Sequence, residues 1–165
     1  MRTPEEIRAY QESLPKKRMG SGAIFRDADG RVLLVKPTYK EYWEIPGGSV
    51  EHNESPLSCC EREISEELGL TRRMGGLLCV DYVVDDGVRT EGVMFVFDGG
   101  VLTHDEIQSI RLPENELSEF RFVLCEEIAT YMTLPLLGRR ITKIARATST
   151  GVTLYLEDGY NPASP

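Results

Sequence analysis

The chain of 165 residues is long enough for one domain with a substantial core, and its apolar share of 41% is ordinary for a globular protein. Its formal net charge of −8 argues against a partner that is bound through broad phosphate neutralisation, such as duplex DNA, but not against a small phosphorylated ligand bridged by a metal ion. No apolar run approaches the roughly 20 residues of a membrane helix. Four cysteines without a CxxC pair, beside only two histidines, argue against a zinc site.

The cysteines and the N-terminus also indicate a compartment. Cys59 and Cys60 are adjacent and would bond to each other only with strain, so a reduced chain is the simpler expectation. The first 17 residues are too polar for a signal peptide. We therefore expect a cytoplasmic protein with neither a membrane nor a nucleic-acid partner.

The first half of the chain predicts one helix and one strand pair. Residues 3–14 predict a short helix with Thr3 as its N-cap. Residues 20–25 and 31–35 predict two strands that form a hairpin-like pair across a polar turn. Residues 36–54 are mostly loop, with a Pro-Gly-Gly turn near the centre.

The second half begins with a helix and continues mainly with strands. Residues 56–68 predict a helix capped by Ser55 and ended by Gly69. The segments that follow are strands at 77–86, 92–100 and 120–124, a mainly helical stretch at 125–148, and a strand at 152–159. The strand-to-strand turns are short, so the pattern predicts an α/β fold whose sheet is antiparallel or mixed.

No repeat or linker divides the chain. We expect an N-terminal extension with its short helix at 1–18, a main domain at 19–148, and a C-terminal strand with a loose tail at 149–165.

The helix predicted at 56–68 carries a cluster of glutamates whose like charges repel one another. Glu63, Glu66 and Glu67 stand at i, i+3 and i+4, so their carboxylates share one face, while Leu57, Ile64 and Leu68 form a separate apolar stripe. The cluster is either a solvated acidic face or a site for a hard divalent cation such as Mg²⁺ or Mn²⁺, which prefers oxygen ligands.

The residues around this helix carry a specific motif. Gly48 is followed after five residues by Glu54, and Glu54 is followed after seven residues by the run from Arg62 to Leu70, "REISEELGL". This segment, 48–70, resembles the Nudix box G-x5-E-x7-R-E-U-x-E-E-x-G-U, where U is a bulky aliphatic residue, and it matches at every fixed position. The resemblance implies an α/β/α sandwich with a mixed sheet.

The resemblance also implies a role for each polar residue of the box. Glu63 and Glu67 would be metal ligands, and Glu66 would be a further ligand or a base that positions water. Gly48 would bind the metal through its carbonyl oxygen. Glu54 and Arg62 would form an ion pair that anchors the loop to the helix. The implied cofactor is Mg²⁺, with Mn²⁺ as an alternative. Glu66 and Glu67 are thus both metal-binding and catalytic candidates.

Members of the family often recruit another glutamate from beyond the box. Residues 113–120 offer Glu114, Glu116 and Glu119, and we favour Glu116 or Glu119 because both come just before the strand at 120–124. The motif fixes neither, and each has the alternative of being a surface glutamate.

Candidates for substrate binding lie in the loop before the box and on the first strand. Trp43 either stacks on a base or packs in the core, which we favour. Tyr39 and Tyr42 are better placed at a pocket mouth, and Arg26 is a candidate phosphate contact. The basic segment 138–148 is a solvated face, a dimer contact or a contact to an anionic substrate.

The resemblance to the Nudix family implies metal-dependent hydrolysis of a diphosphate linkage. The expected substrate is a small nucleoside diphosphate derivative: a nucleoside triphosphate, oxidised forms included, or a nucleotide-sugar. A Nudix-fold nucleotide sensor without turnover is the main alternative, and an isoprenoid diphosphate isomerase is another. A homodimer also stays open.

Overall fold

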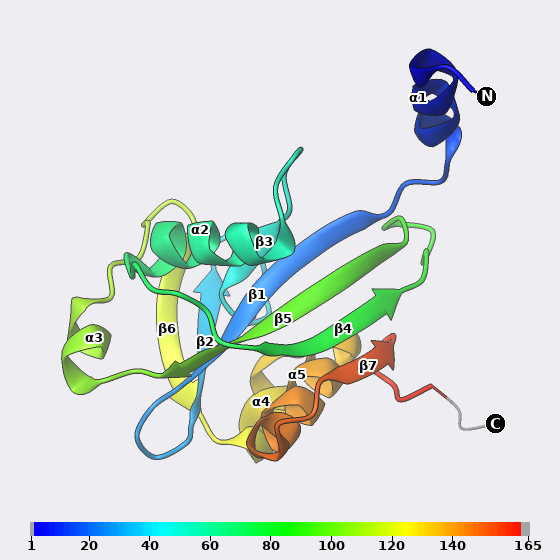
Figure 1. Ribbon diagram of the computed structural model, residues 1–165. Coiled ribbons are helices and arrows are strands. Elements are labelled where there is room, and N and C mark those ends of the chain that lie inside the picture. The colour runs from blue at the N-terminus through cyan, green and yellow to red at the C-terminus, as the bar shows by residue number, and fades with distance from the viewer. Residues whose placement is uncertain (1, 163–165) are drawn as a thin grey trace.

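The computed structural model describes residues 2–162 and builds them around one sheet of seven strands (Figure 1). The strands are β1 (Arg18–Arg26), β2 (Val32–Pro37), β3 (Gly47–Ser49), β4 (Leu77–Val83), β5 (Gly92–Val101), β6 (Leu117–Val123) and β7 (Leu154–Glu157). Their order across the sheet is β6-β2-β1-β5-β4-β7, and β3 pairs with β1 beside this path.

The sheet is mixed, as the sequence predicts. The pairs β1–β2, β1–β3, β2–β6 and β4–β5 are antiparallel, whereas β1–β5 and β4–β7 are parallel. The parallel pair β1–β5 is the longest contact in the sheet and joins strands that are separated in sequence by the whole box. The C-terminal strand β7 is therefore an edge strand of the same sheet and packs beside β4.

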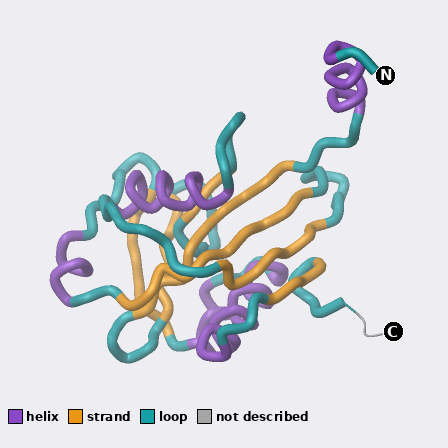
Figure 2. The backbone as a smooth tube through the Cα atoms, viewed as in Figure 1, coloured by secondary structure: helices purple, strands orange, loops and turns teal. Residues whose placement is uncertain are grey.

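Helices cover both faces of the sheet (Figure 2). They are α1 (Pro4–Ser13), α2 (Pro56–Leu68), α3 (His104–Ser109), α4 (Ile128–Tyr131) and α5 (Pro135–Ala147), with 3₁₀ turns η1 (Cys125–Glu127) and η2 (Thr148–Thr150). Helix α2 lies on one face, and α4 and α5 lie on the other, which confirms the α/β/α sandwich (Figure 1). Helix α1 stands away from the sheet and buries none of its residues.

Helix α2 has the bounds that its sequence predicts. The Ser55 hydroxyl accepts a hydrogen bond from the backbone N–H of Ser58 at 3.1 Å, and Pro56 occupies the first turn. Gly69 ends the helix in the left-handed region, with φ of 69°, and its N–H donates to the Ser65 carbonyl at 3.1 Å. Local capping thus fixes both ends of the helix that carries the glutamates.

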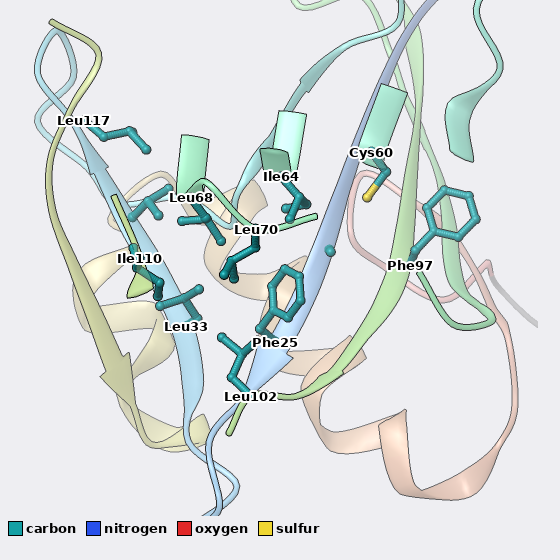
Figure 3. Packing of buried hydrophobic residues seen from close by; sticks show 12 residues of the cluster. Phe25, Leu33, Cys60, Ile64, Leu68, Leu70, Phe97, Leu102, Ile110 and Leu117 are labelled. Atoms are coloured by element: carbon teal, nitrogen blue, oxygen red, sulfur yellow. The ribbon is translucent and has the colours of Figure 1, made fainter. Parts of the chain in front are cut away.

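The apolar face of α2 differs from the predicted stripe. Cys60, Ile64 and Leu68 are fully buried and pack against residues of the sheet, including Phe25 and Leu33 (Figure 3). Leu57, which we expected in this stripe, is 38% exposed. The buried residues of this face are four positions apart, and Cys60 is the buried residue one turn before Ile64. Leu57 lies further back, in the first turn of the helix.

A second core fills the space between the sheet and α4 and α5. Ile24 and Leu34 of the sheet pack there with Ile128, Ile141 and Ile144. Each central strand therefore buries both faces, and the continuous apolar run of β2 reflects this burial.

Several predicted bounds were wrong. The strand expected at 77–86 ends at Val83, because the side chains of Asp85 and Asp86 accept backbone N–H groups within a turn. Strand β6 starts earlier than expected, at Leu117, β7 covers only part of 152–159, and α3 was not predicted. The loose tail was expected at the C-terminus, and residues 163–165 lie outside the described residues. Over the described part of the chain, no helix combines the length and apolarity needed to cross a membrane.

The revised face of α2 gives a stability prediction. We expect Ile64→Ala to lower the free energy of unfolding by about 2–5 kcal/mol, because it leaves a cavity in a packed core. Leu57→Ala, on the same helix, should cost less than about 1 kcal/mol. Urea denaturation of both variants measures the difference, and equal losses would show that the buried face has been assigned wrongly.

Candidate functional site

The site begins where the short strand β3 pairs antiparallel with residues 20–22 of β1. Gly22, Ser21 and Gly20 of β1 pair with Gly47, Gly48 and Ser49 of β3. Gly47 has a φ of 146°, and a Cβ there would collide with the Ser21 carbonyl oxygen. A Cβ on Gly48 would collide with the Glu63 carboxylate. Gly47 therefore requires glycine, whereas a side chain at Gly48 would displace the Glu63 carboxylate, and the two glycines let the backbone of β3 lie directly against the acidic face of α2.

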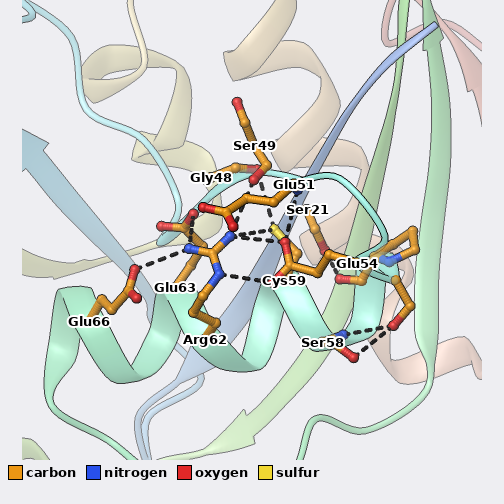
Figure 4. A network of polar contacts seen from close by, with 12 residues as sticks. Ser21, Gly48, Ser49, Glu51, Glu54, Ser58, Cys59, Arg62, Glu63 and Glu66 are labelled. Atoms are coloured by element: carbon orange, nitrogen blue, oxygen red, sulfur yellow. Dashed lines mark hydrogen bonds and ion pairs between the residues drawn. The ribbon is translucent and has the colours of Figure 1, made fainter. Parts of the chain in front are cut away.

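Arg62 connects the loop after β3 to α2 (Figure 4). Its Nε and Nη2 donate to the two carboxylate oxygens of Glu54 at 2.9 and 3.0 Å, a bidentate contact. Its Nη1 donates to Glu63 at 2.8 Å and to Glu66 at 3.1 Å, and Nη2 also donates to the Ser49 carbonyl at 3.3 Å. One guanidinium thus holds the loop and two of the clustered glutamates in place.

The ionisation of Glu54 follows from this contact. The hydrogen bonds from Arg62, with a further one from the Glu51 backbone N–H, lower the pKa of the Glu54 carboxyl to about 2. The same contact raises the pKa of Arg62 above its ordinary value. Both groups are therefore charged throughout the neutral range, and the connection between loop and helix persists there.

Glu67 is the most buried of the clustered glutamates. It is 7% exposed, and its carboxylate accepts the backbone N–H of Gly47 at 2.8 Å. Burial, together with the charges of Glu63, Glu116 and Glu44, raises the pKa of the Glu67 carboxyl to about 8 against the effect of that hydrogen bond. Burial likewise raises the pKa of Glu63, although Arg62 opposes the shift. Negative charge is thus unfavourable at this place unless a cation compensates it.

The donors at this place fit a hard divalent cation by their chemistry. Glu63, Glu66 and Glu67 supply carboxylate oxygens, and β3 brings the carbonyl of Gly48 to the same face of α2 (Figure 4). Within residues 2–162, no three Asp, Glu, His or Cys side chains lie close enough together to hold a metal ion as they stand. The contacts explain this, because Arg62 holds Glu63 and Glu66 while the Gly47 N–H holds Glu67. A cation would have to compete with Arg62 for these two carboxylates.

Cys59 faces the same carbonyl. It is fully buried, and its Sγ lies 3.9 Å from the Gly48 oxygen. Burial raises the pKa of the Cys59 thiol to about 12, with a further contribution from Glu54. The thiol therefore stays protonated and unreactive at neutral pH.

A pocket of about 350 Å³ opens beside Gly47 and Gly48, between the sheet and α5. Its apolar lining consists of Ile45, Val83, Val93, Met94, Met132, Leu136, Leu137 and Ile141. Its charged lining consists of Arg18, Lys40, Glu44, Asp86, Arg89 and Arg140. An elongated ligand can therefore place an anionic part near β3 and an apolar part against α5.

Of the four residues predicted to bind substrate, only Tyr42 lines this pocket among the described residues. Tyr39 is 67% exposed and lies outside it. Trp43 packs edge-on against Tyr131, with a ring distance of 5.6 Å, and against the core on the α5 side. Arg26 lies at the far end of β1 and pairs with Asp98 at 2.8 Å, because the strand extends well beyond its contact with β3.

The two glutamates favoured beyond the box lie in different surroundings. Glu116 is close enough that its charge raises the pKa of both Glu63 and Glu67. Glu119 is exposed and pairs with Arg121. Of the two, Glu116 is therefore within electrostatic range of the glutamate cluster, whereas Glu119 lies on the surface.

None of the six charged residues that line the pocket was among the site residues predicted individually, and Glu44 and Arg140 are the most informative of them. Glu44 lines the pocket beside Gly47, and its carboxylate pairs with Lys40 at 2.7 Å. Arg140 belongs to the basic segment 138–148 but points inward and is only 4% exposed. The sequence does contain a signal for Arg140, because it stands four residues before Ile144 and four after Leu136, on the apolar face of α5.

Known proteins resemble the chain in both sequence and fold. A family model of the NUDIX domain matches residues 16–143. Diphosphoinositol polyphosphate phosphohydrolase 2 of Rattus norvegicus is 36% identical over 76 residues, which are 46% of this chain and 42% of that protein. RNA pyrophosphohydrolase of Halorhodospira halophila is 45% identical over 49 residues, 30% of this chain and 27% of that protein. The matched regions therefore span less than half of the length of either relative.

A solved structure extends the likeness to most of the fold. The crystal structure of a MutT protein from Methanosarcina mazei Go1 superposes with a TM-score of 0.67 at 26% identity, covering 83% of this chain and 99% of that one. The family model spans most of the sheet and both covering layers, and it contains the whole box from Gly48 to Leu70. The chain therefore belongs to the Nudix family.

Proposed function

We propose that the protein hydrolyses a diphosphate linkage in a nucleoside diphosphate derivative, with Mg²⁺ or Mn²⁺ as its cofactor. The substrate would be a nucleoside triphosphate, oxidised forms included, or a nucleotide-sugar. The observation that carries the proposal is the position of Glu63, Glu66 and Glu67 beside the Gly48 carbonyl, at the edge of a pocket large enough for a nucleotide. We expect the protein to act in the cytoplasm.

The proposed ligands of the cation are Glu63, Glu66, Glu67 and the Gly48 carbonyl. When bound, the cation would neutralise the diphosphate, polarise its phosphorus and lower the pKa of a bound water. The protein supplies the rest of the chemistry. The contact between Arg62 and Glu54 holds the loop and the helix in one register, so that the carbonyl and the carboxylates stay in position.

A carboxylate must also accept the proton of the attacking water. Glu66, Glu67 and Glu116 are the candidates, because all three lie at the cluster and their charges interact. Glu116 comes from the turn before β6 and so approaches the cluster from outside α2. Glu116 could therefore act as the base while the glutamates of α2 remain bound to the cation.

The names of the relatives support a shared reaction class with varied substrates. Two of them are named for a diphosphoinositol polyphosphate and for RNA pyrophosphate. The common element is cleavage next to a diphosphate, and the pocket of this chain, apolar over most of its α5 side, suits a nucleobase. The RNA 5′ end therefore belongs among the substrates to be tested, although the net charge of −8 favours small nucleotides.

Substrate turnover is the direct test of the proposal. Phosphate release would be followed in Mg²⁺ with added pyrophosphatase on nucleoside triphosphates, oxidised guanine nucleotides and a 5′-triphosphorylated RNA. ADP-ribose, nucleotide-sugars and dinucleoside polyphosphates would be followed with added alkaline phosphatase, because their cleavage exposes terminal phosphate groups. We expect one class to be favoured, and Glu67→Gln to reduce its turnover by at least about a hundredfold. Glu61→Gln, a control on the same helix whose carboxylate contacts the Met74 N–H, should keep activity. Nucleotide binding without any turnover would instead favour the sensor.

The two glutamates beyond the box give a matched pair of variants. We expect Glu116→Gln to lower kcat by about tenfold or more, because its carboxylate acts at the cluster, with little change in KM. Glu119→Gln should stay within about twofold of wild type, since that residue lies on the surface with Arg121. Steady-state kinetics on the favoured substrate measure both, and the opposite ranking would assign the role to Glu119.

The anchoring role of Arg62 predicts a metal-dependent defect. Lysine keeps the charge but cannot form the bidentate contact with Glu54. We therefore expect Arg62→Lys to raise the Mg²⁺ concentration for half-maximal activity by about 10–100-fold. Arg73→Lys, at an exposed position after α2, is the control. An unchanged Mg²⁺ requirement in Arg62→Lys would contradict the role.

A further inference from the structure

A buried ion pair lies behind the pocket. Asp81 of β4 is fully buried and Arg140 of α5 is 4% exposed. The Nε of Arg140 donates to Oδ2 of Asp81 at 2.5 Å, and Oδ1 of Asp81 accepts the backbone N–H of Gly159 at 3.1 Å. Both oxygens of Asp81 are therefore occupied, and the carboxylate holds the guanidinium in one orientation.

The remaining donors of Arg140 face the pocket. Arg140 contributes to the pocket lining, and neither of its terminal nitrogens, Nη1 and Nη2, donates a hydrogen bond to any residue within 2–162. Among the described residues, the Thr142 hydroxyl is the only buried side-chain polar atom without a hydrogen-bond partner, so the terminal nitrogens of Arg140 are open to solvent in the pocket. A ligand that brings acceptors to these nitrogens would gain charge-assisted hydrogen bonds to a guanidinium whose orientation is already fixed.

The surroundings of Arg140 indicate which part of a ligand would lie there. Leu136, Leu137 and Ile141 of the same helix line the pocket with it, as do Met94 and Met132, whereas Gly47 and Gly48 line the pocket beside the glutamate cluster. If phosphates lie at the cluster, a flat and largely apolar group reaches α5. A nucleobase has these properties, with hydrogen-bonding atoms only on its edge.

The fork of an arginine matches two adjacent acceptors. Guanine offers O6 and N7 side by side, the arrangement that arginine contacts most often in nucleic acids. Cytosine offers O2 and N3. Adenine places an amino donor beside each accessible acceptor, and uracil separates its two carbonyl oxygens by an N–H. Only guanine and cytosine can therefore satisfy both nitrogens at once.

We propose that Arg140, held by Asp81, selects a nucleotide whose base carries two adjacent acceptors, namely guanine or cytosine, over adenine and uracil. The inference rests on the proposed function only in taking this pocket as the nucleotide site. Arg140 is a specificity-determining residue that contacts the base, and Asp81 is a positioning residue that acts through it.

Equilibrium binding of nucleoside monophosphates isolates this selection. GMP, CMP, AMP and UMP share the same sugar phosphate, so differences between them report contacts to the base. Calorimetry in EDTA removes any contribution from metal or hydrolysis. We expect wild type to bind GMP or CMP at least about tenfold more tightly than AMP and UMP. The ranking of GMP and CMP identifies which base supplies the acceptors.

Variants assign the selection to Arg140. In Arg140→Lys the preference should shrink to within about threefold, because one ammonium cannot contact two acceptors. Arg146→Lys, the same change at an exposed position of α5, should keep it. Asp81→Asn keeps the guanidinium but loosens its orientation, so it should weaken the preference with the fold intact by circular dichroism. Uniform weakening of all four ligands in Arg140→Lys would show a phosphate contact and overturn the inference.

The outcomes separate this inference from the hydrolase proposal. Equal affinity of wild type for the four monophosphates overturns base selection even when hydrolysis is found, and needs no variant. Selective binding without turnover of any substrate supports base selection and overturns the hydrolase.

Discussion

The contact between Arg62 and Glu54 is the interaction on which the arrangement of the site depends. It joins a loop that has little regular structure of its own to a helix that is capped at both ends. The same guanidinium contacts Glu63, Glu66 and the Ser49 carbonyl, so loop position and carboxylate position are coupled. Glu54 and Arg62 are both charged at neutral pH, since the pKa of Glu54 is lowered to about 2 and that of Arg62 is raised, so the coupling persists there.

The acidic cluster and the pocket lie on opposite sides of the sheet, and β3 lies between them. Helix α2 carries the acidic cluster on one side, and α5 closes the pocket on the other. Gly47 and Gly48 line the pocket and lie between these layers, because Gly47 approaches the β1 backbone at a distance that only glycine allows and Gly48 lies against the Glu63 carboxylate. The cation and the base of a nucleotide would thus be held by separate layers of the sandwich, with the phosphates between them.

The parts of the fold and site that the sequence predicted are those with local causes. Caps and periodicity define α2, and the box spacing identifies its glutamates and Arg62. The sequence left undetermined the features that depend on contacts between distant segments. The parallel pairing of β1 with β5 and of β7 with β4 brings together strands far apart in sequence. The inward position of Arg140 depends on Asp81, 59 residues earlier. Arg26 and Tyr39 were chosen by residue type, but pairing and exposure place them outside the pocket. Trp43 packs against Tyr131 and the core, which is the alternative we favoured over stacking on a base.

The central claim is that the acidic face of α2 and the Gly48 carbonyl together bind a divalent cation. Anomalous diffraction from crystals soaked in Mn²⁺ tests it directly. The account predicts an anomalous peak about 2.0–2.3 Å from oxygens of Glu63 and Glu67 and from the Gly48 carbonyl, with Arg62 released from Glu63 but still on Glu54. Well-ordered crystals with no peak at this face, or with Mn²⁺ bound only elsewhere, would contradict it.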